Sequence, residues 1–88
     1  MTDLTPVEIP RPLKKKLDKK TPQMQAAILA CIQQLRTDWR HPGLRAKKLS
    51  GTSDFEARVT EGARLTFRWD GPTIVVTNHC HHDILKGL

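Results

Sequence analysis

Residues 52–86 read TSDFEARVTEGARLTFRWDGPTIVVTNHCHHDILK, and this stretch decides the fold. It contains three runs in which residue types alternate with a period of two, a pattern typical of half-buried antiparallel strands. Each run has apolar residues at one parity and mainly polar residues at the other. Turn signals at residues 61–63 and 71–72 separate the runs. The pattern therefore predicts three antiparallel strands with one apolar face and one polar face.

The two turns predict the register of these strands. Glu61-Gly62-Ala63 suits a three-residue loop with a left-handed glycine, which pairs Val59 with Leu65. Gly71-Pro72 suits a type II′ turn, which pairs Trp69 with Ile74. Extended along the strands, this register predicts the cross-strand pairs Arg58–Thr66, Thr66–Thr77, Arg64–Thr60, Arg64–His79 and Glu56–Arg68. Arginine, histidine and threonine are thereby expected to gather on the polar face, with Cys80 on the apolar face.

Two helices are expected before these strands. The first covers residues 12–20 and has Leu13 and Leu17 on one face. The second follows Thr21 as N-cap, with Pro22 at its first position. Its apolar stripe consists of Met24, Ala27, Ile28, Cys31, Ile32, Leu35 and Trp39. The HPG at 41–43 ends this helix, and residues 44–49 predict a further short strand. The order predicts an α+β domain with helices packed on one face of an antiparallel sheet.

Length and charge limit the classes of function. The 88 residues predict a single domain, 1–88, in which residues 1–11 form an extended arm or an edge strand. The formal net charge of +6 predicts an acidic partner such as nucleic acid or an acidic protein. No apolar run is long enough to span a bilayer, so a membrane partner is not expected. Two distant cysteines without secretory features favour reduced thiols and a cytoplasmic protein.

The polar face is the candidate functional surface, because guanidinium groups bind phosphate in a bidentate way and lysine supplies a point charge. The alternative is an ordinary solvated strand face with cross-strand ion pairs. The cations expected on the polar face are Arg45, Lys47, Lys48, Arg58, Arg64 and Arg68.

The NHCHHD sequence at 78–83 is the second unusual feature. Imidazoles beside arginines can act as general acids or bases, since histidine titrates near neutrality. The alternative is a polar strand end with Cys80 in the core. A metal site is not expected, because alternation separates His79 and His81 from Cys80 and the chain has no second cluster of ligands.

Three segments resemble the small toxins of the RelE/ParE superfamily: HPGLRAKKLSG (41–51), FEARVTEGARLTFRWDG (55–71) and TIVVTNHCHHDILK (73–86). The most specific parts are the LRxKKLxG segment, the ExRVxxGxRLxF hairpin and the HxxHDIL ending, and the resemblance covers about residues 13–86. It implies a RelE-like fold, in which two N-terminal helices pack on one face of a small curved antiparallel β-sheet.

RelE-type members cleave messenger RNA on the ribosome without metal. The resemblance therefore implies the toxin of a type II toxin–antitoxin system, with no cofactor and with an acidic antitoxin that covers the basic face. It implies that Arg58 and Arg64 steady the scissile phosphate and that His81 or His82 transfers protons. The implied catalytic residues are Lys47, Lys48, Arg58, Arg64, His81 and His82, and the expected RNA-binding residues are Arg45, Arg68 and His79.

One departure from the family pattern leaves other hypotheses open. The chain contains no tyrosine, and Leu85 stands where many active members carry a tyrosine that stacks on RNA. Other members of the superfamily inhibit DNA gyrase and have no nuclease site. The alternatives are therefore a non-enzymatic, ParE-like gyrase inhibitor or a catalytically silent RelE-like binding module.

Overall fold

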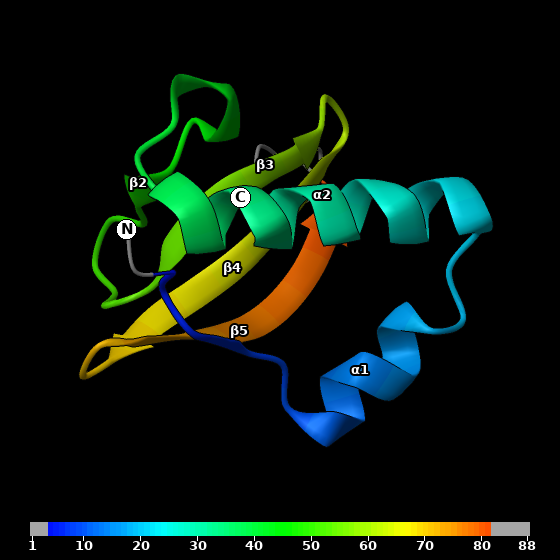
Figure 1. The fold of residues 1–88 in the computed structure, drawn as a ribbon, viewed down its shortest axis with the longest axis horizontal. Coiled ribbons are helices and arrows are strands. Elements are labelled where there is room, and N and C mark those ends of the chain that lie inside the picture. The colour runs from blue at the N-terminus through cyan, green and yellow to red at the C-terminus, as the bar shows by residue number, and fades with distance from the viewer. Residues whose placement is uncertain (1–3, 82–88) are drawn as a thin grey trace.

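The computed structural model describes residues 4–81, and only the backbone of residues 80 and 81. Two helices pack against a five-stranded sheet with the strand order β1-β5-β4-β3-β2 (Figure 1). This confirms the predicted α+β class. The elements are β1 (Val7–Glu8), α1 (Arg11–Leu17), α2 (Pro22–Asp38), the 3-10 helix η1 (Pro42–Leu44), β2 (Lys47–Lys48), β3 (Phe55–Thr60), β4 (Ala63–Asp70) and β5 (Thr73–His81).

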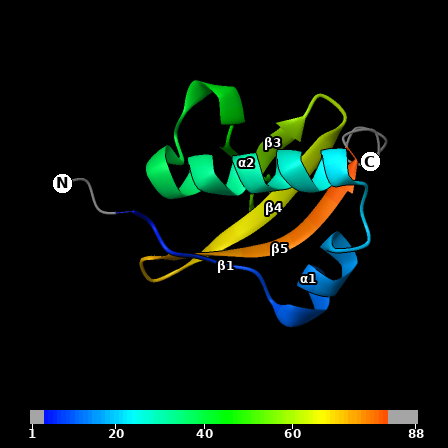
Figure 2. The same cartoon turned by 45° about the vertical axis from the view of Figure 1, so that its right-hand side comes forward.

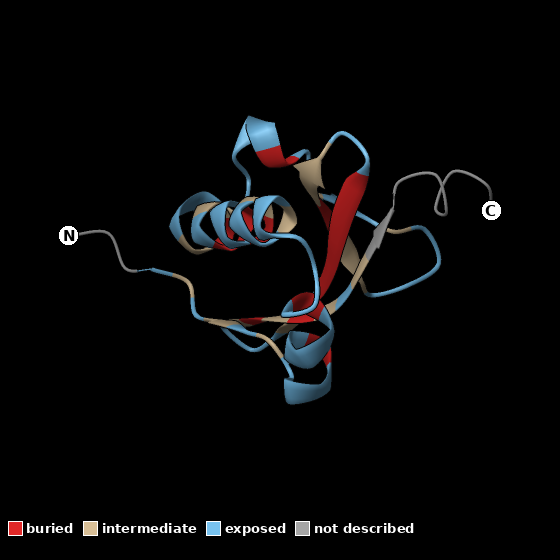
Figure 3. Cartoon of the chain, turned by 90° about the vertical axis from the view of Figure 1, so that its right-hand side faces the viewer, coloured by how far each residue is buried: buried red, intermediate tan, exposed pale blue. Residues whose placement is uncertain are grey.

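Helix α2 crosses the sheet and supplies one wall of the core. Thr21 caps it as predicted, because its Oγ1 accepts the backbone N–H of Met24 at 3.1 Å. Figure 3 shows the helix almost end-on, with its buried side toward the sheet and its exposed side away from it. The buried residues of α2 are Ile28, Cys31, Ile32 and Leu35, all members of the predicted stripe.

The apolar face of the sheet supplies the other wall. Leu65, Phe67, Ile74 and Val76 have no exposed surface and pack in one cluster with α2 and with Leu13 and Leu17 of α1. Cys31 lies in the same cluster, and its burial raises the pKa of the thiol from 9.0 to about 12. The Cys31 thiol therefore stays protonated, and unreactive as a nucleophile, at neutral pH.

Both edge strands differ in detail from the sequence expectation. Val7–Glu8 forms an edge strand as expected, but it runs parallel to β5, so the sheet is mixed rather than wholly antiparallel (Figure 2). The expected strand at 44–49 is reduced to Lys47–Lys48. Leu44 is instead part of η1 and is 4% exposed, because its side chain joins the core.

The β3–β4 hairpin has a tighter turn than predicted. Only Glu61 and Gly62 separate the two strands, and Leu65 lies opposite Ala57 rather than Val59. The predicted pairing is therefore wrong by two positions. A shift of two leaves every side chain on its predicted face, because the side-chain period of a strand is two.

The corrected register changes the pairs across the polar face. Arg58 lies opposite Arg64, and Glu56 lies opposite Thr66. An irregularity between Arg58 and Thr60 then sets Thr60 opposite Ala63. The predicted pairs that this register replaces are Arg58–Thr66, Glu56–Arg68 and Arg64–Thr60.

The β4–β5 hairpin begins in the predicted register. Trp69 lies opposite Ile74, and the turn contains Gly71-Pro72 as expected. Gly71 has a φ of 59°, which places it in the left-handed region.

A β-bulge then interrupts this register. Phe67 pairs with Val76, but the next residue of β4, Thr66, pairs with Asn78. Thr77 is the extra residue on β5, and it has no residue of its own opposite it. The predicted Thr66–Thr77 pair is therefore absent from the backbone ladder, although the two hydroxyl oxygens lie 2.8 Å apart and share a hydrogen bond.

The bulge reverses the expected faces of the last part of β5. Arg64 lies opposite Cys80, and His79 lies opposite Leu65. The predicted Arg64–His79 pair is wrong. Directly opposite residues share a face of the sheet. The register therefore places His79 with the core-facing residues. The predicted core position of the Cys80 side chain lies outside the described part of the structure.

Two glycines give a matched test of the turns. Gly71 has positive φ, whereas Gly62, predicted to be left-handed, does not, and neither would clash with an added Cβ. Gly71→Ala is expected to lower the free energy of unfolding by about 1 kcal/mol, because L-residues disfavour this region. Gly62→Ala is expected to be neutral or to stabilise by about 0.5 kcal/mol. Urea unfolding of both variants checks this, and equal losses would contradict it.

Candidate nucleic-acid interface

The polar face of the sheet lies opposite α2. Within residues 4–81 both helices lie on the other side of the sheet or at its end, and none covers this face (Figure 3). Three of its side chains are nevertheless almost hidden from solvent: Glu56 at 5%, Arg64 at 9% and Thr66 at 7% exposure. The face is thus a packed polar layer rather than a fully solvated one.

Arg58 and Arg64 form the centre of this layer. They lie directly opposite each other on β3 and β4, a placement that is unfavourable for like charges. Arg58 approaches the Glu61 carboxylate, with Nη2 and Oε1 3.8 Å apart, and its side chain is 28% exposed. Glu61 is 93% exposed, so this ion pair is loose and open to exchange with another anion.

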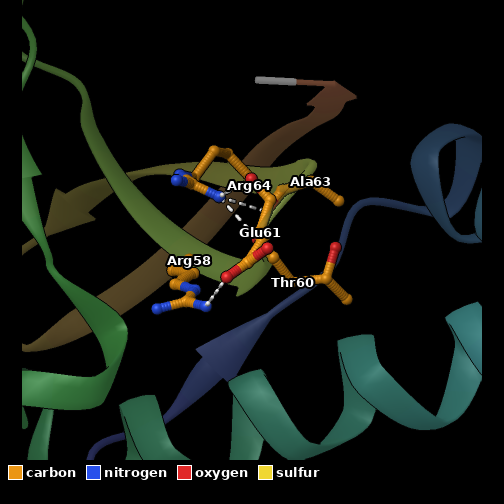
Figure 4. Close-up of polar contacts among 5 residues, drawn as sticks. All are labelled: Arg58, Thr60, Glu61, Ala63 and Arg64. Atoms are coloured by element: carbon orange, nitrogen blue, oxygen red, sulfur yellow. Dashed lines mark hydrogen bonds and ion pairs between the residues drawn. The ribbon is translucent and has the colours of Figure 1, made fainter. Parts of the chain in front are cut away.

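Arg64 is held by the backbone of the β3–β4 turn. Its Nη1 donates to the carbonyl oxygens of Thr60, Glu61 and Ala63, the last two at 3.2 and 3.0 Å (Figure 4). Carbonyl oxygens at the turn thus satisfy one side of the guanidinium. This fixes the position of the charge beside Arg58 without neutralising it.

Glu56 is a member of the layer that the sequence-based site did not include. Its Oε1 lies 3.4 Å from the Nζ of Lys47 on the neighbouring strand β2. The Lys47 side chain is 69% exposed, whereas that of Glu56 is 7% exposed. The carboxylate therefore anchors an exposed lysine at the edge of the face. The alternation in FEARVT does place Glu56 on the polar face, but only the strand pairing shows which cation it meets.

Lys48 does not join this layer. It lies opposite Phe55, a residue that packs against the core, so its side chain leaves β2 on the other face. Arg68 has the parity of the polar face and is exposed. It lies four residues along β4 from Arg64, which is about 14 Å away in a strand. Arg45 is exposed in the segment just before β2.

The histidines are only partly described. His79 is half-buried and, by register, on the core side, and Asn78 Oδ1 accepts its backbone N–H at 2.8 Å. The backbone of His81 pairs with Ala63. His82 lies outside the described residues. Among the side chains in the described part, no three His, Cys, Asp or Glu residues are grouped so as to hold a metal ion.

The structure therefore brings Lys47, Arg58 and Arg64 together and separates them from Lys48. A layer of one buried carboxylate, one buried threonine and three cations can bind an anion. Such a surface suits a phosphodiester.

No protein-family model and no curated protein sequence matches this chain. Solved structures do match over nearly the whole length. The RelBE2 toxin–antitoxin complex from Mycobacterium tuberculosis contains a chain with 25% identity and a TM-score of 0.64, covering 90% of this chain and 99% of that one. This protein has the RelE-like fold.

Two further structures support the RelE-like fold at lower identity. A YoeB/ParE toxin from Agrobacterium tumefaciens has a TM-score of 0.72 with 14% identity and covers 88% of this chain and 98% of its own. The archaeal RelE–RelB complex from Pyrococcus horikoshii OT3 also gives 0.72, with 18% identity, over 89% and 94% of the two chains. The RelE-like architecture inferred from the three sequence segments is thus confirmed.

The two central arginines are expected to differ in their effect on stability. Arg64→Met removes the donor that three turn carbonyls share and is expected to cost about 1–2 kcal/mol of unfolding free energy. Arg58→Met removes only the loose pair with Glu61 and is expected to cost less than about 0.5 kcal/mol. Urea denaturation followed by circular dichroism measures both, and a larger loss for Arg58→Met would contradict the assigned contacts.

Proposed function

We propose that this chain is the toxin of a type II toxin–antitoxin pair and that it cleaves messenger RNA on the ribosome, in the cytoplasm and without metal. The observation that carries the proposal is the pair Arg58–Arg64 at the centre of the polar face. The RelE-like fold supports it, since one of the similar structures is a toxin–antitoxin complex and another is a RelE–RelB complex.

The proposed reaction is an internal transesterification. The ribose 2′-oxygen attacks the adjacent phosphorus and forms a bond to it, while the bond from phosphorus to the 5′-oxygen breaks. The products are a cyclic phosphate and a free 5′-hydroxyl. The 2′-hydroxyl gives up its proton to an acceptor, and the departing 5′-oxygen receives one.

The layer supplies charge at the phosphorane. Arg58 is the cation whose present partner, the Glu61 carboxylate, is exposed enough to yield to a phosphate. Arg64 stands opposite, held by the turn carbonyls, and Lys47 adds a third positive charge at the edge. Preorganised cations stabilise developing negative charge without reorganisation during the reaction. His81 or His82, whose side chains lie outside the described part of the structure, is the proposed proton carrier. Lys48 and Arg68 are proposed to contact RNA outside the centre, whereas His79 lies on the core side of the sheet by register.

Arg58 is the better residue for the decisive test, because substitution of Arg64 also disturbs the turn. Wild type and Arg58→Gln are expressed in growing bacteria, and the 5′ ends of transcripts are mapped. Wild type is expected to produce new 5′-hydroxyl ends within translated regions, and Arg58→Gln to reduce their number by about 100-fold, as for loss of one charge that stabilises the transition state. Growth arrest with intact transcripts would contradict the proposal.

The missing tyrosine favours a second candidate, a gyrase inhibitor without nuclease activity. The same experiment separates the two. Arrest with a DNA-damage response and unchanged messenger RNA supports gyrase inhibition. Co-purification of gyrase with the wild-type chain is then the required confirmation. A catalytically silent binding module would show neither RNA cleavage nor gyrase inhibition.

The proposed antitoxin has a second surface available on the helix side. A hollow of about 420 Å³ lies between α1, α2 and the segment after β1, with an apolar lining that includes Leu17, Ile28 and Ile32. Leu29 lines it and is 57% exposed. Lys14 borders it, and Lys15 and Lys16 follow on α1. An amphipathic helix with acidic flanks fits this chemistry, with the apolar stripe in the hollow and the acids beside the lysines.

Leu29 and Leu4 provide a matched pair for this interface. Both are exposed leucines, at 57% and 53%, but only Leu29 lines the hollow. Leu29→Lys is expected to weaken capture of the antitoxin encoded beside this chain by about 10-fold or more, as expected when a buried apolar contact becomes charged. Leu4→Lys is expected to change it little. Titration calorimetry measures both, and equal effects would exclude the hollow as the docking site.

A further inference from the structure

Arg45 has an unusual backbone conformation. Its φ is 48° and its ψ is 40°, which is the left-handed helical region. Among residues 4–81 it is the only residue other than glycine with positive φ. The conformation is unfavourable for L-residues, and asparagine and glycine adopt it with less strain.

The path of the chain explains why this position is left-handed. Leu44, directly before it, is buried at the end of η1, and Lys47, two residues later, begins the edge strand β2. The Arg45 N–H donates to the Pro42 carbonyl oxygen at 3.2 Å and closes η1. A left-handed residue commonly ends a helix. This role explains the backbone conformation of Arg45, but it does not explain why the residue is an arginine.

The side chain of Arg45 makes no polar contact within the described part of the protein. It is exposed, and its guanidinium makes no hydrogen bond or ion pair with any residue in the described part of the chain. A strained residue whose side chain contributes no stabilising contact is a candidate for a functional contact. Lys47, two residues further along the chain, is the cation at the edge of the polar layer.

We propose that Arg45 binds an RNA phosphate at the β2 edge of the sheet, next to the reacting centre, and that the fold tolerates backbone strain to keep a guanidinium there. This inference rests on the proposed function. Arg45 is then a residue that positions the RNA strand by binding its backbone. A guanidinium without a partner in the described part of the chain can bind two oxygens of a phosphate in bidentate fashion.

Arg45→Asn separates the backbone strain from the charge of the side chain, because asparagine adopts the left-handed region readily but carries no charge. It is expected to raise Tm by about 4 °C. It is also expected to weaken binding of a short single-stranded RNA by about 3- to 10-fold. The slope of log affinity against log salt is expected to fall by about 0.7, the value for one phosphate contact to a single strand. The probe carries a fluorophore and 2′-O-methyl riboses, so it binds without being cleaved.

Two control variants complete the design. Arg45→Lys keeps both the charge and the strain, so Tm and the salt slope are expected to stay unchanged while affinity falls modestly through loss of bidentate geometry. Lys20→Asn removes one exposed charge far along the chain on a residue with ordinary backbone geometry. It is expected to leave Tm unchanged and to reduce RNA affinity less than Arg45→Asn does.

The possible outcomes separate the role of Arg45 from the proposed nuclease activity. A stabilised Arg45→Asn variant that binds the probe as tightly as wild type overturns the role of Arg45 and leaves the proposed nuclease intact. An Arg45→Asn variant that loses stability overturns the claim of strain. A wild-type chain that fails to bind the probe even at low salt overturns the role of Arg45, whereas the proposed nuclease is decided separately by the mapping of transcript ends.

Discussion

The pairing of β4 with β3 on one side and β5 on the other is the interaction on which the rest of this structure depends. One face of β4 contributes Leu65 and Phe67 to the core beneath α2, and both side chains are fully buried. The other face contributes Arg64 and Thr66 to the polar layer. Because alternate side chains of a strand point to opposite faces, burial of the first set determines the position of the second.

The polar layer that results is electrostatically incomplete. Two guanidinium groups on paired strands repel each other, and the nearby anions only partly offset this. Glu56 forms its ion pair with Lys47. Glu61 is exposed, and its carboxylate lies 3.8 Å from Arg58, a long distance for an ion pair. The turn carbonyls that hold Arg64 carry partial rather than full charge. An anion placed between the arginines would complete the layer, and this is the basis for proposing a phosphodiester as its ligand.

Much of this arrangement follows from local sequence. The stripe on α2, its Thr21 cap, the faces of β3 and β4 and the turn at Gly71 are all encoded by neighbouring residues, so each was predictable. The cross-strand partners were less predictable. The β3–β4 turn has two residues rather than three, and Thr77 forms a bulge that no local propensity marks. As a result Arg64 lies opposite Arg58, whereas His79 lies opposite the core residue Leu65.

The amino-acid sequence by itself determined the class of fold and the residues available to the site, because hydrophobic periodicity and turn chemistry act over a few neighbouring positions. Only the tertiary structure decided which of those residues meet. It placed Glu56 beside Lys47, sent Lys48 to the opposite face and put Arg45 in a left-handed conformation. The physical reason is that register and bulges depend on packing the whole sheet against α2, a condition that no single strand contains.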